Sequence, residues 1–452
     1  MKSFKSINPF DQSVVGEHKL MNESELKAAL QNAETVFASW KKTSFEHRSD
    51  LLNSLASILR ERKDEFATTM ALEMGKILKE GKTEIEKCAA TCVYYAEHGE
   101  AFMRDEMIST EGKKSFVDFQ PTGAVFGIMP WNFPFWQVIR AAAPTIMAGN
   151  VFLLKHAPNV SRCSKEIEKV FREAGFPQHV FQSLIIDIDQ TEKIISSDAV
   201  QGVTLTGSEL AGSSVASLAG KHIKKTVLEL GGSDPLIVLE DADLEKASKV
   251  ALQSRMQNAG QSCIASKRFI VLEKVKDDFI QKLIDGAKKL KQGNQLDEST
   301  TMAPMARVDL AEKLEAQEKS SLKNGTEILI GGNRNGCNYQ PTLLNNVKPG
   351  VPAFDEEMFG PVAAIITAKD EDEAIQLANK NRYGLGASIW TKDLDRGERI
   401  AKMINSGSVF INSLVRSDAR LPFGGIKKSG YGRELSKYGM HEFTNIKTIF
   451  IE

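Results

Sequence analysis

Apolar residues recur at helical spacing through the first hundred positions of the chain. After Asn22, which is placed to cap a helix together with Glu25, apolar residues follow every three or four positions as far as Trp40. A second stripe of the same kind begins at Leu51. We therefore predict that the first hundred residues form helices whose apolar faces lie in a core.

The period of the pattern changes near Phe116. From there short apolar runs alternate with helical segments, which is typical of parallel sheets covered by helices. We expect an α/β fold with two parallel-sheet lobes, the change of lobe lying between Glu229 and Asp234. The predicted strands span 124–129, 151–154, 180–186, 202–205, 226–230, 235–239, 268–272, 362–367 and 387–390, and helices are predicted at 243–259 and 372–379.

Residues 444–451 alternate between apolar and polar and predict an edge strand. Such a strand can pair with the segment 115–119 of the same chain or with another subunit. Because an uncovered edge promotes association, we expect a homo-oligomer, either a dimer or a tetramer.

Composition and charge exclude several classes of protein. With 452 residues, 42% of them hydrophobic, the chain exceeds one ordinary domain. Its net charge of −1 comes from interspersed acids and bases, so nothing indicates a nucleic-acid partner. The uncharged stretch 122–139 is interrupted by Gly123, Pro130 and Pro134, which favours a strand, a turn and a helix over a membrane span.

The N-terminus lacks the apolar run of a signal peptide, and we expect a soluble protein in the cytoplasm. The five cysteines are too few, and odd in number, for a disulfide framework. Cys88 and Cys92 lie four apart in a helical pattern, but a metal site needs two more ligands and only His98 is near in sequence. We therefore expect buried thiols and no metal there.

Three residues beside glycine or proline turns carry the candidate chemistry: Cys263, Glu229 and Asn132. A thiol can attack an aldehyde, an amide can hold the resulting oxyanion, and a carboxylate can activate water. Each also has a simpler interpretation. Cys263 can be a structural cysteine, Glu229 can be a strand-end acid that faces solvent or Lys225, and Asn132 can be a turn residue. The combination favours catalysis, because a carboxylate between two leucines is costly to bury without a purpose.

Other polar residues follow predicted strands where ligands of parallel sheets bind. Lys155 ends one strand, and the turn Thr206-Gly207-Ser208 follows another and leads into a helix, as in anion sites at helix N-termini. Two glycines five apart are common by chance, so an ordinary strand–helix turn stays open here. Glu357 and Phe359 precede a turn that can equally be an ordinary loop.

Taken in order, these segments resemble the aldehyde dehydrogenase superfamily along nearly the whole chain. The seven motifs are Pro-Trp-Asn-Phe-Pro (130–134), Ala-Gly-Asn-x-x-x-x-Lys (148–155), Thr-Gly-Ser (206–208), Leu-Glu-Leu-Gly-Gly (228–232), Gly-Gln-x-Cys (260–263), Glu-x-Phe-Gly-Pro (357–361) and Pro-Phe-Gly-Gly-x-Lys-x-Ser-Gly (422–430). The resemblance implies a Rossmann-like cofactor domain (1–102 and 122–228), a catalytic domain (229–432) and a small β oligomerisation arm (103–121 and 433–452).

The resemblance also implies roles for individual residues. Cys263 would be the nucleophile, Glu229 the base, and Asn132 the oxyanion donor together with the Cys263 amide. An aldehyde would become a thiohemiacetal on sulfur, pass hydride to NAD or NADP, and leave as the acid after thioester hydrolysis. The residues implied in binding the cofactor are Trp131, Lys155, Thr206, Gly207, Ser208, Glu357 and Phe359.

The chain is most similar to the succinate-semialdehyde dehydrogenases of this superfamily. Arg140 and Ser417 stand where those members hold the substrate carboxylate, and Arg416 and Arg420 can add charge or be solvated or ion-paired. Pro158 replaces a glutamate with which many relatives contact the adenosine ribose, which leaves NADP possible as well as NAD. Ala265 replaces a second cysteine that some relatives carry, so no local disulfide switch is expected.

Other functions remain open from the sequence. The substrate can be another small aldehyde, such as glutarate semialdehyde or an aliphatic aldehyde. A CoA-acylating enzyme is disfavoured by Glu229, which such relatives generally lack. A non-catalytic protein on this fold is disfavoured because Cys263, Glu229 and Asn132 are all present.

Overall fold

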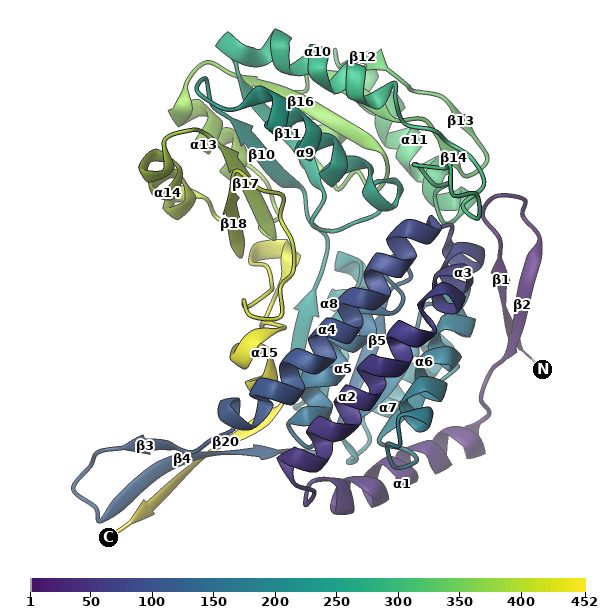
Figure 1. Ribbon diagram of the computed structural model, residues 1–452, viewed down its shortest axis with the longest axis vertical. Helices are drawn as coiled ribbons and strands as arrows, with labels where there is room; N and C mark the ends of the chain where they lie inside the picture. Colours follow the sequence, from purple (N-terminus) through teal and green to yellow (C-terminus); the bar gives the residue numbers. More distant parts are fainter. Residues whose placement is uncertain (1) are drawn as a thin grey trace.

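The computed structural model describes residues 2–452, and Figure 1 shows two lobes and a projecting arm. The α-helices are α1 Glu23–Trp40, α2 Phe45–Glu61, α3 Lys63–Met74, α4 Leu78–Phe102, α5 Trp136–Met147, α6 Ser161–Glu173, α7 Thr191–Ile195, α8 Glu209–Lys221, α9 Leu244–Met256, α10 Lys276–Ala287, α11 Val308–Leu322, α12 Pro352–Asp355, α13 Glu371–Asn379, α14 Leu394–Met403 and α15 Ser436–His441. Among residues 2–452, no helix combines the length and the apolar character needed to cross a membrane.

The first lobe is built on a six-stranded sheet in the order β19-β9-β8-β5-β6-β7. Its strands are β5 Ala124–Met129, β6 Val151–His156, β7 Phe181–Ser183, β8 Val200–Thr206, β9 Lys225–Glu229 and β19 Gly430–Tyr431. All neighbours are parallel except β19 and β9. The strands are almost entirely buried, as their continuous apolar sequences predict for a sheet covered on both faces.

The second lobe is built on a seven-stranded sheet in the order β12-β15-β16-β11-β10-β17-β18. Its strands are β10 Asp234–Val238, β11 Ser266–Leu272, β12 Glu327–Ile330, β15 Thr342–Asn345, β16 Val362–Ala368, β17 Gly386–Trp390 and β18 Ser408–Ile411. Only the pair β12–β15 is antiparallel. The chain changes sheet between Glu229 and Asp234, where the sequence predicts the change of lobe, and the α/β fold class is confirmed.

The arm is a three-stranded antiparallel sheet in the order β20-β4-β3. It consists of β3 Glu106–Ile108, β4 Lys114–Pro121 and β20 Thr444–Ile451, and it extends from the first lobe (Figure 1). β20 pairs with β4 along its whole length, from Thr444 opposite Pro121 to Ile451 opposite Lys114. Of the two predicted partners of 444–451, the structure contains the one in the same chain.

The division into domains stays a prediction, and one pairing crosses its boundary. Gly430 and Tyr431, at the end of the segment assigned to the catalytic domain, pair with Glu229 and Leu228 in the first sheet. The C-terminal part of the chain therefore returns to the first lobe before it enters the arm.

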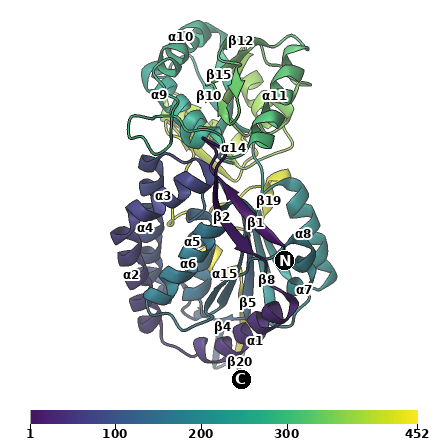
Figure 2. The same cartoon turned by 90° about the vertical axis from the view of Figure 1, so that its right-hand side faces the viewer.

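Three sequence predictions need correction. The first hundred residues are not all helical, because β1 Ser3–Ile7 and β2 Val14–Lys19 form a hairpin beside the first lobe (Figure 2). The strand predicted at 180–186 is limited to Phe181–Ser183, where it pairs with β6. A short hairpin of β13 Arg334–Asn335 and β14 Asn338–Tyr339 completes the elements and was not predicted.

The helix predicted at 243–259 ends earlier, at Met256, and a 3₁₀ turn, η3 Gln257–Gly260, follows. Asn258 and Ala259 have φ of 54° and 52°, in the left-handed region that ends an α-helix. This reversal directs the chain toward Cys263. Non-glycine residues held in this region store strain, which is common next to active sites.

The carboxyl edge of the first sheet faces the second lobe. Pro130 to Asn132 follow β5, Lys155 lies near the end of β6, Ser208 follows β8 and Glu229 ends β9. The order of strands reverses between β5 and β8, which makes this edge a topological switch point. Sheet order thus brings together residues that are scattered through a hundred positions of sequence.

Candidate active site

The candidate nucleophile lies between η3 and β11. Cys263 keeps some exposed surface, whereas the other four cysteines are buried, and all five are free thiols among the described residues. Lys267 donates to the carbonyls of Ser262 (2.8 Å) and Cys263 (2.6 Å), which fixes the loop. Burial raises the pKa of Cys263 to about 11, against the opposing charge of Lys267. The thiol is therefore protonated near neutral pH and needs a base or a change of surroundings to ionise.

The backbone at Gly231 and Gly232 leaves room for this loop. A Cβ at Gly232 would lie 2.8 Å from the carbonyl oxygen of Cys263, and one at Gly231 would lie 2.6 Å from Glu357 Oε2. The Gly232 amide also donates to Glu357 Oε1 at 2.9 Å. The double glycine lets the segment between the sheets pass close to the nucleophile.

The amide of Asn132 is buried against the same loop. Its Nδ2 donates to the carbonyl of Gln261 at 3.0 Å, and Asn258 Nδ2 donates to the Asn132 carbonyl at 2.8 Å. A primary amide has two N–H groups, and only one is used in this contact. The backbone amide of Cys263 donates to no carbonyl among residues 2–452. Two donors are thus available near the thiol for an oxyanion.

Glu229 is a buried carboxyl at the end of β9. It is 2% exposed, and neither carboxyl oxygen has a hydrogen-bond partner in the described chain. Burial raises its pKa well above the usual value, and the charge of Glu434 adds to the rise, while Arg140 and Arg433 oppose it. The alternative of a solvent-facing strand-end acid is therefore wrong, as is a pairing with Lys225, which contacts Glu442.

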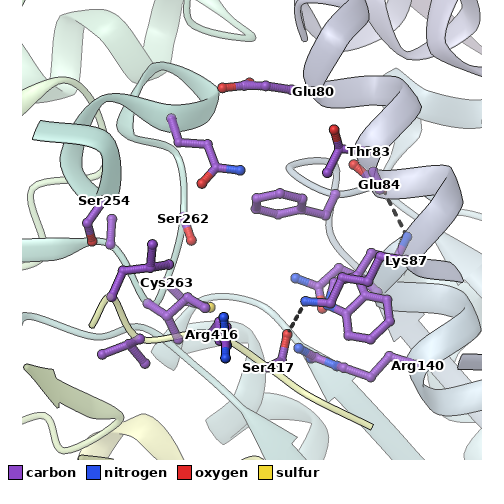
Figure 3. A pocket seen from close by; sticks show the side chains of 18 of the residues that line it. Glu80, Thr83, Glu84, Lys87, Arg140, Ser254, Ser262, Cys263, Arg416 and Ser417 are labelled. Carbon is purple, nitrogen blue, oxygen red and sulfur yellow. Dashed lines mark hydrogen bonds between the residues drawn. The ribbon is translucent and has the colours of Figure 1, made fainter. Parts of the chain in front are cut away.

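A cavity of about 230 Å³ opens on the thiol (Figure 3). Cys263, Ser262 and Ala265 form one side, and residues of α4 and α5 form the other. Its lining also includes Lys87, Trp136, Arg140, Arg416, Ser417 and Phe423. The structure thus brings Cys263, Arg140 and Ser417 together, although Arg140 and Ser417 lie 277 positions apart in the sequence (417 − 140).

Arg140 and Ser417 both have protein partners in this cavity. Arg140 forms an ion pair with Glu434 and donates to Thr206 Oγ1 at 3.2 Å. Ser417 Oγ accepts a hydrogen bond of 2.6 Å from Lys87 Nζ, drawn as a dashed line in Figure 3. Arg416 is exposed, and Arg420 pairs with Asp418 at 2.7 Å outside the cavity.

Two features of the carboxyl edge fit a dinucleotide. Lys155 is 8% exposed, and its ammonium forms no ion pair or hydrogen bond with the described residues, so a buried donor is available for a ribose or phosphate. Burial lowers its pKa, because the charged form lacks a partner. The turn Thr206-Gly207-Ser208 leads into α8, with Ser208 as N-cap, and presents the amide end of a thirteen-residue helix to an anion.

The remaining cofactor candidates come from both lobes. The rings of Trp131 and Phe359 contact edge to face, with centroids 5.9 Å apart. Glu357 accepts from Gly232 and lies 3.6 Å from Lys267 Nζ. Carboxylate and aromatic groups at this junction suit a ribose and a planar ring, and these residues would hold NAD(P) between the lobes.

One face of α4 and the turn before it organise the site, and sequence reasoning missed it. Glu80, Glu84 and Lys87 lie at helical spacing on this face, and Lys76 lies two residues before the helix begins. Lys76 pairs with Glu84 and donates to the Asn132 carbonyl at 2.9 Å, and Glu80 accepts from the Asn258 amide at 3.0 Å. Glu84 also accepts from the amides of Phe135 and Trp136, at 2.9 Å each, at the start of α5.

No metal site accompanies this arrangement in the part of the chain that the structure describes. Residues 2–452 contain no group of three or more His, Cys, Asp or Glu side chains placed to hold an ion. The site is a thiol, an amide, a buried carboxyl and a cationic cavity.

Comparisons with known proteins agree with this geometry. The model of the aldehyde dehydrogenase family matches residues 1–449. A Synechocystis sp. protein named "Probable succinate-semialdehyde dehydrogenase [NADP(+)]" is 46% identical over 449 residues, with 99% of each chain covered. An Escherichia coli succinate semialdehyde dehydrogenase [NAD(P)+] is 44% identical, covering 98% of this chain and 97% of its own.

A solved structure gives the same result in three dimensions. The succinic semialdehyde dehydrogenase of Streptococcus pyogenes, in complex with NADP+, superimposes with a TM-score of 0.97 at 38% identity. The match covers 99% of both chains. The arrangement of lobes and arm is therefore shared with a protein that binds NADP+.

Proposed function

Because this chain belongs to the aldehyde dehydrogenase family, we propose that it oxidises succinate semialdehyde to succinate with NADP+ or NAD+. The relatives named above carry this activity in their names. The proposal concerns the substrate and the cofactor, and it includes the roles of the individual site residues.

One observation supports the substrate most directly: the nucleophile and a cationic group of side chains share one small cavity. Cys263 lies on one side, and Lys87, Arg140, Arg416 and Ser417 line the same space. An aldehyde that also carries a carboxylate fits such a cavity, because the aldehyde reaches the thiol while the carboxylate meets cations and a hydroxyl.

The chemistry proposed for the catalytic residues follows from their surroundings. The Cys263 sulfur adds to the carbonyl carbon, and Asn132 Nδ2 and the Cys263 amide donate to the oxygen that becomes negative. Bound NAD(P)+ supplies the acceptor for the hydride that leaves this carbon. Glu229, whose raised pKa makes it a stronger base than a free carboxylate, takes a proton from the water that cleaves the thioester.

The cofactor proposal rests on the carboxyl edge of the first sheet. Lys155 and Glu357 would bind the riboses, Trp131, Thr206, Gly207 and Ser208 would line the site, and Phe359 would pack near the nicotinamide. Pro158 follows β6 and is exposed, so no carboxylate stands at this position to repel the 2′-phosphate of NADP.

We further propose that the arm joins subunits into a homo-oligomer and that the enzyme works in the cytoplasm. The arm exposes large apolar side chains on an uncovered three-stranded sheet: Met107, Ile108, Ile446, Phe450 and Ile451. Five free thiols and the absence of a disulfide in the described chain suit a reducing compartment.

The test measures reduced-cofactor formation with succinate semialdehyde, glutarate semialdehyde and butanal, each with NAD+ and NADP+. We expect the highest kcat/KM with succinate semialdehyde, and we expect Cys263→Ala to lose turnover of every substrate. Faster oxidation of butanal than of succinate semialdehyde would contradict the substrate while leaving the family unaffected. Full turnover by Cys263→Ala would exclude the proposed nucleophile.

A further inference from the structure

Arg140, the expected partner of the substrate carboxylate, is already compensated. It is 2% exposed, forms an ion pair with the buried Glu434, and donates to Thr206. Its guanidinium also lies 4.7 Å from the ring centre of Phe423. A guanidinium balanced by one carboxylate attracts a second carboxylate much less than a free one does.

Lys87 is the second cation on this wall, and no carboxylate balances it. Its Nζ donates to Ser417 Oγ at 2.6 Å and lies 4.0 Å from the ring centre of Trp136, but it forms no ion pair within the described chain. It comes from the middle of α4 and lines the cavity that opens on Cys263. Burial lowers the pKa of Lys87 to about 8, as expected for an ammonium held from water without a counter-ion.

The hydrogen bond between Lys87 and Ser417 prepares the hydroxyl as a donor. Because Lys87 can only donate, Ser417 Oγ accepts in this contact, and its own hydrogen remains available. An ammonium and a hydroxyl hydrogen that point into one space form a site for a carboxylate with two oxygens.

The other charges near Lys87 do not replace this counter-ion. Arg140 repels its ammonium, while Glu84 and Asp418 attract it from a distance. Glu84 is paired with Lys76, and Asp418 is paired with Arg420. Both acids are therefore already compensated by other cations.

We propose that Lys87, together with Ser417, binds the distal carboxylate of the substrate, and that Arg140 is a positioning residue that holds Glu434 beside Glu229. This inference rests on the proposed function, because it names the group that selects a semialdehyde carrying a carboxylate. It assigns selectivity for the substrate carboxylate to Lys87 on α4, and control of the pKa of Glu229 to Arg140 on α5.

The experiment compares Lys87→Met, Lys87→Arg and Arg140→Met with the wild type, using succinate semialdehyde and butanal. Butanal has the same four carbons but no carboxylate. Lys87→Met should lower kcat/KM for succinate semialdehyde by about 10- to 100-fold, the usual range for a lost charged hydrogen bond, with a loss for butanal at least tenfold smaller. Lys87→Arg keeps the charge and should recover part of the preference.

Arg140→Met should lower kcat/KM for both substrates by similar factors. It should also move the acid limb of the kcat profile for butanal to higher pH, because the charge of Arg140 opposes the rise in the pKa of Glu229. Lys87→Met should leave this limb in place. Arg420→Met serves as the matched control, since Arg420 is a nearby cation that is paired with Asp418 outside the cavity.

The outcomes separate the two proposals. A wild-type enzyme that does not prefer succinate semialdehyde to butanal contradicts the proposed function itself. A wild type that shows the preference, with Lys87→Met keeping it or losing both substrates equally, overturns the role of Lys87. If Arg140→Met loses the preference for succinate semialdehyde and the acid limb of its kcat profile does not shift, Arg140 is the group that binds the carboxylate.

Discussion

Burial raises the pKa of both Glu229 and Cys263. The pKa of Cys263 is raised to about 11, and the pKa of Glu229 is raised well above its usual value. Burial disfavours the charged form of each group, so ionisation of either one depends on its neighbouring charges and on access of water to the site. The chemistry at this scale is therefore controlled by solvent access and by the neighbouring charges of Arg140 and Glu434.

Replacing Glu229 by Gln should separate the two halves of the reaction. The amide has nearly the same shape but cannot take a proton from water, so the thioester on Cys263 should accumulate. We expect a rapid burst of about one reduced cofactor per active chain, followed by a steady rate lower by about 10²- to 10⁴-fold. Stopped-flow absorbance measures both phases, and loss of the burst itself would mean that Glu229 acts before the thioester forms.

The charge of Glu434 should set the pH at which the base becomes active. Glu229 works as a base only when deprotonated, so its raised pKa moves the acid limb of activity to higher pH, and the negative charge of Glu434 contributes to that rise. Glu434→Gln should therefore shift the limb to lower pH. The measurement is kcat against pH for the variant and the wild type, and a shift to higher pH would contradict this coupling.

The sequence predicts the residues that act beside turns but not those that support them. Cys263, Glu229 and Asn132 each lie in a short motif next to glycine or proline, which distinguishes them locally. Lys87 lies in an amphipathic helical stretch, where a lysine usually marks a solvated face. Its partner Ser417 is 330 residues away, and no local pattern carries such a contact.

At the scale of elements, α4 and the residues just before it contact four segments of the site. Lys76, two residues before the helix, donates to the carbonyl of Asn132. Within α4, Glu80 accepts from the amide of Asn258, Glu84 accepts from the start of α5, and Lys87 donates to Ser417. The spacing of about 1.5 Å per residue along a helix fixes the distances between these contacts. One helix thus contacts both the loop that leads to Cys263, through Glu80, and the group that we propose binds the substrate carboxylate, through Lys87.

Removing Glu80 should loosen the nucleophile loop. Its carboxylate accepts from the amide of Asn258, which together with Ala259 is held at positive φ in the turn before Cys263. Glu80→Ala leaves this donor without a partner and should lower kcat by about tenfold or more, since small displacements of reacting groups have effects of that size. Glu80→Gln retains an acceptor and serves as the control, and equal kcat in wild type and Glu80→Ala would show that the loop holds its shape unaided.

The sequence predicts elements best where both faces are buried. The bounds of β5 match the predicted strand at both ends, and the capping box at Asn22 is present. The hairpin of β1 and β2 was missed because its strands are short and largely exposed, and they show no clear apolar period. The end of α9 was placed too late because its left-handed turn uses Asn258 and Ala259 rather than glycine.

At the scale of the molecule, two sheets meet at the site and a third extends away from it. The first sheet contributes its carboxyl edge, and the second contributes the loops that precede β11 and β16. Neither lobe contains a complete site. The arm, in contrast, has no helix of its own to cover it, and its apolar side chains remain exposed in the single chain.

Charges placed on the arm should dissociate the proposed assembly. Ile446 and Phe450 point to the same side of β20 and are 61% and 49% exposed. The double variant Ile446→Asp/Phe450→Asp should reduce the mass measured by light scattering to that of one chain, 49.8 kDa. Lys447→Asp, on the opposite side of the strand, is the control, and a wild type already at this mass would contradict the oligomer.

Hydrogen bonds between segments that are far apart in the sequence also determine when a newly synthesised chain can complete its cavity and the base of its arm. Chains fold from the N-terminus while the ribosome still elongates them, so the five parallel strands of the first sheet can pair long before residues 417 and 434 exist, whereas β19 is added later. Ser417, which accepts a hydrogen bond from Lys87, is synthesised 330 positions after it. Phe443, whose carbonyl accepts from Thr122 at the base of the arm, is synthesised 321 positions after Thr122. A nascent chain therefore contains Cys263 and Lys87 well before Ser417 and Phe443 are made, and it can complete neither this wall of the cavity nor the base of the arm until synthesis has passed those residues.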